Sequence, residues 1–222
     1  MAALRPSLRA CEVRHGDVLT HQGAAVTHVY FPETAQLANT VTFADGRSAE
    51  PFVMGTEGVS ALAACLTEKP CAWSVDVEVS GLTYQLPASV LREQAAGSPE
   101  VRRTLDDITY DYQVQAALAA ACASLHAAPA RLAKLLLIRS DRLGVPLLHL
   151  TQEELAQRLG LLRSTVNTSA NRLKADGAIE YSRGNITIRN RSALISAACE
   201  CYLEQGAVLQ GKAHCPKNPE RA

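Results

Sequence analysis

The chain of 222 residues carries 22 basic and 22 acidic side chains, so its formal net charge is zero. The charges are unevenly placed, because residues 1–128 hold 8 Lys/Arg against 14 Asp/Glu whereas residues 129–195 hold 11 against 5. No apolar run approaches the roughly 20 residues needed to span a membrane, and the N-terminus lacks the apolar core of a signal peptide. The 7 scattered cysteines are typical of a reducing compartment. We therefore expect a cytoplasmic protein with no membrane partner, in which one basic module binds a polyanion.

Residues 10–97 are predicted to form β structure. Glycines separate short stretches that read as strands, for example residues 25–31, 37–43, 74–79 and 82–86. Asp45 and Gly46 form a hairpin-turn signal. Many short strands separated by turns are typical of a sandwich or a barrel, so we expect an all-β first domain.

A long helix is predicted over residues 98–127, with Ser98 as its cap and Pro99 at the first helical position. Two stripes of mostly apolar residues follow it. The first is Val101, Leu105, Ile108, Tyr112, Gln115, Ala119, Cys122 and His126, and the second is Val114, Leu118, Ala121 and Leu125. Two stripes suit two partners, a second copy of the helix and the chain's own β domain, which predicts a homodimer. The alternative is a helix packed within one core.

The Ala-Ala-Pro sequence of residues 127–129 interrupts the helical pattern and is the candidate hinge between two domains. A helix over residues 129–143 is expected to open the second domain, which extends to residue 205. Residues 206–222 form a tail.

Residues 151–173, TQEELAQRLGLLRSTVNTSANRL, predict two short helices joined by a tight turn. Thr151 and Glu154 form a capping box at the start of the first helix. Gly160 lies where the chain must turn, because glycine tolerates positive φ. The pattern is typical of a helix-turn-helix, which places its second helix in the major groove of DNA. An ordinary helical hairpin is the alternative.

The outer side of the second helix is predicted to contact DNA. It carries Arg163, Ser164, Asn167, Thr168 and Asn171. Such side chains donate to phosphates and read base edges, and arginine can pair with guanine through two bonds.

A short β-hairpin is predicted directly behind this helix. Residues 178–181 and 186–188 read as strands, and residues 182–185 between them have turn chemistry. A hairpin in this position is a wing, and Arg183 at its tip is placed to meet a phosphate.

These motifs resemble a known family. The run LTQEELAQRLGLLRSTVNTSANRLKADGAIEYSRGNITIRNRSAL is similar to the winged-helix end of the cyclic AMP receptor protein / fumarate-nitrate reductase regulator (Crp/Fnr) superfamily. RLAKLLLIRSDRLG and AACECY are similar to a large bacterial subgroup, and residues 29–62 resemble the sensor domain. The resemblance covers residues 10–205. It implies an α+β fold with a cupin-like β-roll sensor domain (10–97), a dimerisation helix (98–127) and a C-terminal winged helix-turn-helix (129–205).

The resemblance implies a homodimeric transcription regulator of a partly palindromic site on double-stranded DNA. Arg163 is the expected guanine contact, and Ser164 and Thr168 fall on other base-reading positions. Thr165, Arg183 and the backbone at Gln152 are expected to contact phosphates. RNA polymerase and an unidentified small effector are further candidate partners. The operator, and the choice between activation and repression, stay open.

The usual residues that bind cyclic AMP are missing. In the family an Arg-Ser pair holds the cyclic phosphate and a glutamate holds the ribose, and these positions fall on Pro70, Cys71 and Ser60. Proline offers neither a charge nor a backbone N–H to a phosphate. We therefore expect an effector other than cyclic AMP. A shifted register, with Arg47 or Lys69 as the cation, is the alternative.

Metal and haem sensing find little support in the cysteine and histidine spacing. An iron–sulfur cluster of the fumarate-nitrate type needs several closely spaced cysteines near the N-terminus, where only Cys11 is found. The remaining candidates are Cys65, Cys71, the Cys122/His126 pair and the Cys199/Cys201 pair. They form no standard metal set and are expected to be small buried residues, so no cofactor and no metal is predicted. The Cys122/His126 pair is the best candidate for metal or redox sensing.

Catalysis is not expected. Metal cupins use two histidines one residue apart, and His15, His21 and His28 contain no such pair. No Ser/His/Asp set or phosphate loop stands out. The alternatives to the regulator described above are a cyclic-nucleotide- or redox-responsive regulator and a DNA-independent interaction protein with a vestigial wing.

Overall fold

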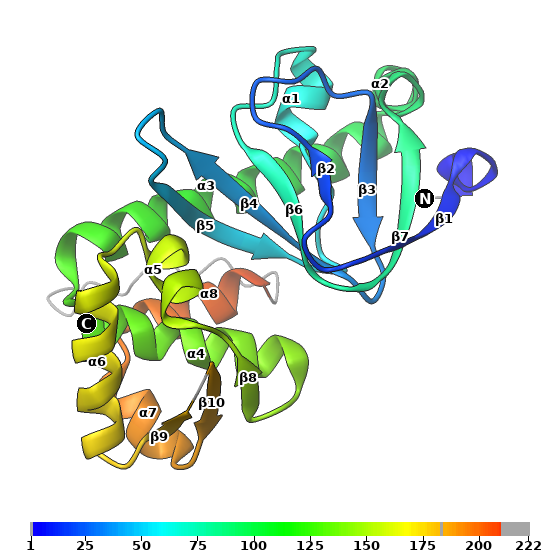
Figure 1. Cartoon of the computed structure of the whole chain (residues 1–222). Coiled ribbons are helices and arrows are strands. Elements are labelled where there is room, and N and C mark those ends of the chain that lie inside the picture. The colour runs from blue at the N-terminus through cyan, green and yellow to red at the C-terminus, as the bar shows by residue number, and fades with distance from the viewer. Residues whose placement is uncertain (1, 183, 210–222) are drawn as a thin grey trace, which may run out of the picture. The chain divides into compact units, whose positions relative to one another are not determined.

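The computed structural model describes residues 2–182 and 184–209, and the chain divides into two compact units between Val114 and Gln115 (Figure 1). Helix α3 (Pro99–Leu125) contributes to both units. None of the described helices combines the length and the hydropathy needed to cross a bilayer.

Two antiparallel sheets form most of the first unit. One has the order β1 (Arg9–Val13), β7 (Gly81–Pro87), β3 (His28–Pro32), and the other β2 (Val18–Thr20), β6 (Ser74–Val79), β4 (Gln36–Thr42), β5 (Ser48–Met54). A 3-10 helix (Ala2–Ser7) precedes β1, α1 (Leu62–Thr67) follows β5, and α2 (Ala88–Gly97) follows β7. The β-rich first domain predicted from the glycine-punctuated sequence is confirmed.

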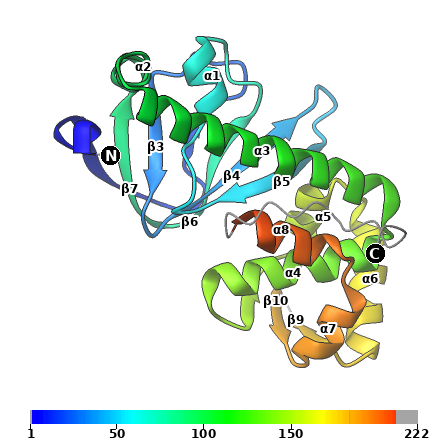
Figure 2. The same cartoon turned by 180° about the vertical axis from the view of Figure 1, so that it is seen from behind.

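The core of the first unit joins both sheets to α3, which crosses the strands in Figure 2. Val29 of β3 and Leu37 of β4 are fully buried. Tyr112 of α3 stacks on Phe52 with 5.1 Å between ring centroids. The Tyr112 hydroxyl accepts the Val59 backbone N–H at 2.7 Å and donates to the Val59 carbonyl at 3.0 Å. The first stripe of the long helix is therefore used within its own chain.

Helix α4 (Ala128–Leu143) lies at the centre of the second unit. The other elements are β8 (Leu147–His149), α5 (Gln152–Leu159), α6 (Arg163–Ala175), β9 (Ile179–Ser182), β10 (Asn185–Ile188), α7 (Arg191–Ala197) and α8 (Cys201–Leu209). The three strands form an antiparallel sheet in the order β8-β10-β9. The two wing strands agree with the prediction, whereas β8 was not predicted from the sequence. The observed order of helices and strands confirms the α+β class and the C-terminal helix-turn-helix.

The second unit begins earlier than the sequence indicated. Helix α3 ends at Leu125 and α4 begins at Ala128, so the helical path breaks beside the predicted hinge. The last part of α3 nevertheless groups with the second unit. One reason is that Cys122 packs against Cys199 and Cys201, outside the leucine-rich core around α4.

Candidate nucleic-acid interface

The helix-turn-helix begins at a complete capping box. The Glu154 N–H donates to the Thr151 hydroxyl at 3.2 Å, and the Glu154 carboxylate accepts the Thr151 N–H at 2.7 Å. These bonds satisfy backbone donors that a helix start leaves without partners. Leu155 and Ala156, just inside the helix, are buried. The capping box therefore fixes where α5 begins and which of its faces packs inward.

The turn between the two helices depends on Gly160. Its φ of 61° and ψ of 40° lie in the left-handed region, where a side chain adds strain. The Leu161 N–H then donates to the Ala156 carbonyl at 2.9 Å. Arg131 of α4 donates from its guanidinium to the Leu159 carbonyl, so a basic side chain also caps the end of α5. The direction of α6 is thereby set relative to α5 and α4.

Helix α6 has one buried and one exposed face. Val166, Ala170 and Leu173 are at most 2% exposed and pack into the core of the second unit. The exposed face contains Arg163, Ser164, Asn167, Thr168 and Asn171, as the sequence predicted, and Thr165 is half-buried at its edge. The N-cap residue Leu162 has no side-chain acceptor, so its side chain does not cap the first N–H groups of α6. A helix start of this kind attracts an anion such as a phosphate.

The polar face is organised by side-chain hydrogen bonds. Gln152 of α5 donates to the Asn167 Oδ1 at 2.8 Å, and Asn171 donates to the same oxygen at 3.4 Å. The Thr168 hydroxyl donates to the Ser164 carbonyl at 3.1 Å. Within the described part of the chain, Arg163 has no ion-pair partner. Its guanidinium is therefore a cation of α6 that is available to a ligand.

The wing is the hairpin of β9 and β10. Arg189 forms an ion pair with Glu180 across it, and His149 of β8 bonds Asn185 of β10 at 2.7 Å. Arg183, the predicted phosphate contact at the tip, lies outside the described residues.

Part of the basic excess of the second unit serves internal contacts. Arg191 pairs with Asp141 at 2.6 Å and also donates to the Tyr202 hydroxyl at 2.8 Å. Tyr202 in turn donates to Asp141 at 2.7 Å, and burial together with this hydrogen bond raises the pKa of the Tyr202 phenol. The charge count alone therefore overstates the number of cations available to a polyanion.

The positions expected to hold a cyclic nucleotide serve other contacts. Ser60 is fully buried, and its hydroxyl accepts the Tyr30 N–H at 2.8 Å. Cys71 is also buried, and its N–H donates to the Ala24 carbonyl at 2.8 Å. Pro70 is exposed and offers no donor. None of these three side chains carries a positive charge that could pair with a phosphate.

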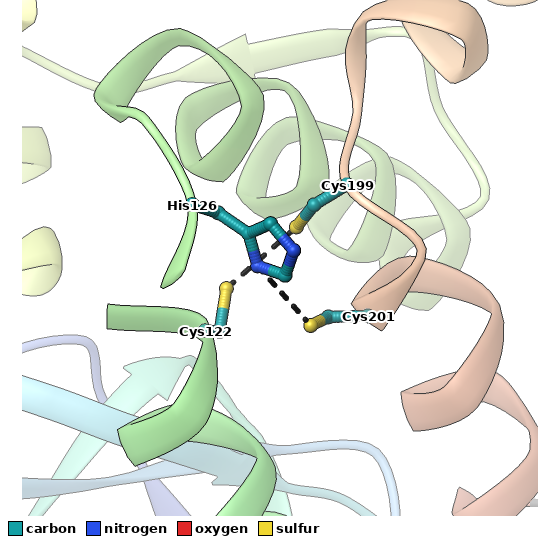
Figure 3. Close-up of side chains that lie close together, drawn as sticks. All are labelled: Cys122, His126, Cys199 and Cys201. Atoms are coloured by element: carbon teal, nitrogen blue, oxygen red, sulfur yellow. Dashed lines mark hydrogen bonds between the residues drawn. The ribbon is translucent and has the colours of Figure 1, made fainter. Parts of the chain in front are cut away.

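Four side chains from separate parts of the sequence lie close together in the second unit. Cys122, His126, Cys199 and Cys201 place their ligand atoms within 4.8 Å of one another (Figure 3). Because Cys122 and Cys199 are 77 residues apart in the sequence, local spacing does not reveal that they are neighbours. The available signals were the i,i+4 spacing of Cys122 and His126 and the Cys-Glu-Cys sequence at residues 199–201.

Comparison with known proteins agrees with this geometry. Residues 130–197 match the family model of a Crp-like helix-turn-helix domain. No curated protein sequence matches the chain.

Solved structures share the fold over most of the chain. A regulator of the Crp/Fnr family from Eubacterium rectale has a TM-score of 0.78 and 18% identity, covering 88% of this chain and 92% of that one. FixK2 from Bradyrhizobium japonicum has a TM-score of 0.73 and 19% identity, covering 86% and 98%. TTHA1359, a Crp/Fnr-family regulator from Thermus thermophilus, has a TM-score of 0.72 and 17% identity, covering 86% and 98%. At these identities the likeness establishes the fold.

Proposed function

Because the chain carries a Crp-like helix-turn-helix domain and has the fold of Crp/Fnr-family regulators, we propose that it is a transcription regulator that binds double-stranded DNA as a homodimer. The observation that carries the proposal is the exposed polar face of α6, which begins at Arg163. The opposite face of the helix is buried in the core of the second unit. Such a helix can enter the major groove with its first turns against the base edges.

Contacts to DNA divide into base and phosphate contacts. Arg163 pairs with a guanine through its two-pronged guanidinium, and Ser164 and Thr168 face neighbouring base pairs. Thr165, Arg183 and the start of α5 at Gln152 contact phosphates. Asn167 and Asn171 complete the polar face between these two groups.

The dimer seam follows the second stripe of α3. Val114 and Leu118 are half-buried, Ala121 is exposed, and Leu125 is 77% exposed. The first stripe is largely covered within the chain, so the second is the one left for a second copy. Two copies related by a twofold axis would present their α6 helices to major grooves about 34 Å apart and read a partly palindromic site.

The β-rich unit is the proposed sensor, for an effector other than cyclic AMP. The buried roles of Ser60 and Cys71, together with the exposed Pro70, support this part of the proposal. The chain then acts in the cytoplasm, with RNA polymerase as a candidate partner on the DNA and without a catalytic step.

Selection of bound fragments from a random DNA pool by the full chain tests the proposal. We expect enrichment of two inverted half-sites separated by about one helical turn. Enrichment of a single unpaired half-site would contradict the dimer, and no enrichment at all would favour a DNA-independent interaction protein.

A further inference from the structure

A compact cluster of three cysteines and one histidine lies in the second unit. Cys122 comes from the last turn of α3 and His126 directly follows that helix. Cys199 and Cys201 come from the segment that joins α7 to α8. Figure 3 shows the four side chains pointing toward a common centre.

The distances in this cluster suit a single metal ion. The Cys122 and Cys199 Sγ atoms are 3.6 Å apart, and the Cys201 Sγ atom is 3.6 Å from the His126 Nδ1 atom. Around a tetrahedral Zn²⁺ with Zn–S bonds of about 2.3 Å and Zn–N bonds of about 2.0 Å, neighbouring ligand atoms lie about 3.5–3.8 Å apart. All four ligand atoms lie within 4.8 Å of one another, so a small contraction closes the set around one ion.

Ordinary core packing explains this cluster poorly. The three sulfurs form a buried group of their own, and Ala130 is the apolar side chain of the described residues that packs against it. The main core of the unit consists largely of leucine, isoleucine, valine and alanine. A core position that needs only a small apolar side chain is equally served by alanine or valine. Three thiols and an imidazole at one point are the donor set of a structural zinc site.

Two charged side chains, Glu200 and Lys134, lie beside the cluster. The His126 Nε2 atom lies 3.2 Å from a Glu200 carboxylate oxygen, which leaves Nδ1 directed at the sulfurs. A carboxylate behind a ligating histidine fixes the ring tautomer and orientation in many zinc sites. The Lys134 ammonium lies close to the Cys122 sulfur. The positive charge of Lys134 offsets the net negative charge that three thiolates give to a Zn²⁺ site.

We propose that Cys122, Cys199, Cys201 and the His126 Nδ1 atom bind one Zn²⁺ ion in a Cys₃His site that joins the end of α3 to the α7–α8 segment. The four ligands complete a tetrahedral shell and leave no open position for a substrate, so the ion is structural. It fastens the first and last described parts of the second unit to each other. This zinc site is expected whether or not the chain binds DNA.

Metal analysis of the full chain, purified under reducing conditions, is the first test. We expect about one Zn²⁺ per chain, lost on incubation with a chelator. Co²⁺ added to the chelator-treated chain should give the visible absorption of a tetrahedral site with thiolate-to-cobalt charge-transfer bands, and Zn²⁺ should abolish both signals. A chain that holds no zinc and shows no such cobalt spectrum would overturn the proposal. So would a Cys122–Cys199 disulfide in the reduced preparation.

Variants identify the ligands. Cys199→Ser and Cys201→Ser should each retain well under one Zn²⁺ per chain and lose about one third of the charge-transfer intensity with Co²⁺, since one of three thiolates is removed. Cys11→Ser, on β1 of the first unit, and Cys215→Ser, outside the described residues, are the matched controls and should keep wild-type zinc content. Loss of zinc in Cys215→Ser but not in Cys201→Ser would show the proposed ligand set to be wrong.

Thermal unfolding with and without a chelator distinguishes a variant that has lost the metal from one that is misfolded. The chelator should lower the Tm of the wild type and of Cys11→Ser, because an ion that binds only the folded state stabilises it. It should change the Tm of Cys199→Ser much less, because this variant holds little zinc to lose. An equal chelator effect on all three proteins would contradict the site.

Discussion

The Gln152 side-chain amide donates a 2.8 Å hydrogen bond to the Asn167 Oδ1 atom and so connects the start of α5 to the exposed face of α6. Asn171 donates to the same oxygen at 3.4 Å. Because this oxygen is already engaged, Asn167 presents its amide N–H₂ group outward. It can donate to a phosphate or a base acceptor, but it offers little as an acceptor itself.

Asn167→Asp tests this orientation. The substitution keeps the oxygen that receives Gln152 but replaces the outward donor with a negatively charged oxygen next to the DNA. We expect a loss of affinity of roughly 1–3 kcal/mol for a selected site, and a smaller loss for Asn167→Ala, which removes the donor and the Gln152 acceptor but adds no negative charge. Fluorescence anisotropy titrations of both variants provide the comparison. Equal losses would mean that Asn167 does not face the nucleic acid.

Arg163→Ala is expected to weaken binding to the selected site by about 1–3 kcal/mol and to relax the preference at one base position in each half-site. The reason is the loss of a two-bond contact with guanine. Arg163→Lys is the informative companion, because it keeps the charge but cannot make the two-pronged contact. It should retain binding to random DNA and lose the base preference. Repeating the DNA selection with each variant checks this, and an unchanged preference in both would exclude Arg163 as a base contact.

Arg183→Ala is expected to weaken binding to all DNA sequences alike. A wing-tip arginine that contacts a phosphate releases a counterion, so the slope of log K against log salt should become shallower by about 1. The matched control is Arg189→Ala, since Arg189 is engaged by Glu180 across the wing. Its slope should stay near that of the wild type. Titrations at several salt concentrations measure both, and a change of base preference in Arg183→Ala would contradict a phosphate role.

The sequence predicted the helix-turn-helix and the wing of the second unit closely. The capping box, the turn at Gly160 and the alternation in the wing are local signals, and each determines an element within a few residues of itself. The strand β8 was not predicted because it has only three residues, Leu147–His149, too few for a periodic pattern. Its pairing with β10 depends on a partner far along the chain, which local periodicity cannot reveal.

The candidate metal cluster could not be read from the sequence for a similar reason. Cys122 and Cys199 are brought together by the packing of α3 and the α7–α8 segment, not by a short motif. The same applies to the two stripes of the long helix. The sequence predicted both stripes, but only the burial of Tyr112 against Phe52 shows which of them is occupied within the chain.

Gly160→Ala is expected to destabilise the second unit by about 1–2 kcal/mol, because residue 160 must adopt a left-handed conformation that alanine disfavours. Chemical denaturation of the full chain, followed by a probe in the helix-turn-helix, measures this. Gly206→Ala is the control in the same unit, since Gly206 lies within α8 with open space around its Cα atom. It should be neutral or slightly stabilising. A similar response to both substitutions would mean that the turn does not depend on the conformation of Gly160.

Leu118→Glu is expected to convert the dimer into a monomer. Leu118 lies in the middle of the second stripe of α3, where a carboxylate facing its twofold-related copy would be both desolvated and repelled by a like charge. Gln113→Glu is the matched control, because Gln113 is exposed on α3 outside both stripes. Sedimentation of the two variants at micromolar concentration gives their oligomeric states. Only Leu118→Glu should become monomeric. It should then lose most of its affinity for an operator with two half-sites, whereas its affinity for a single half-site should change little. A Leu118→Glu protein that stays dimeric would place the seam elsewhere on the chain.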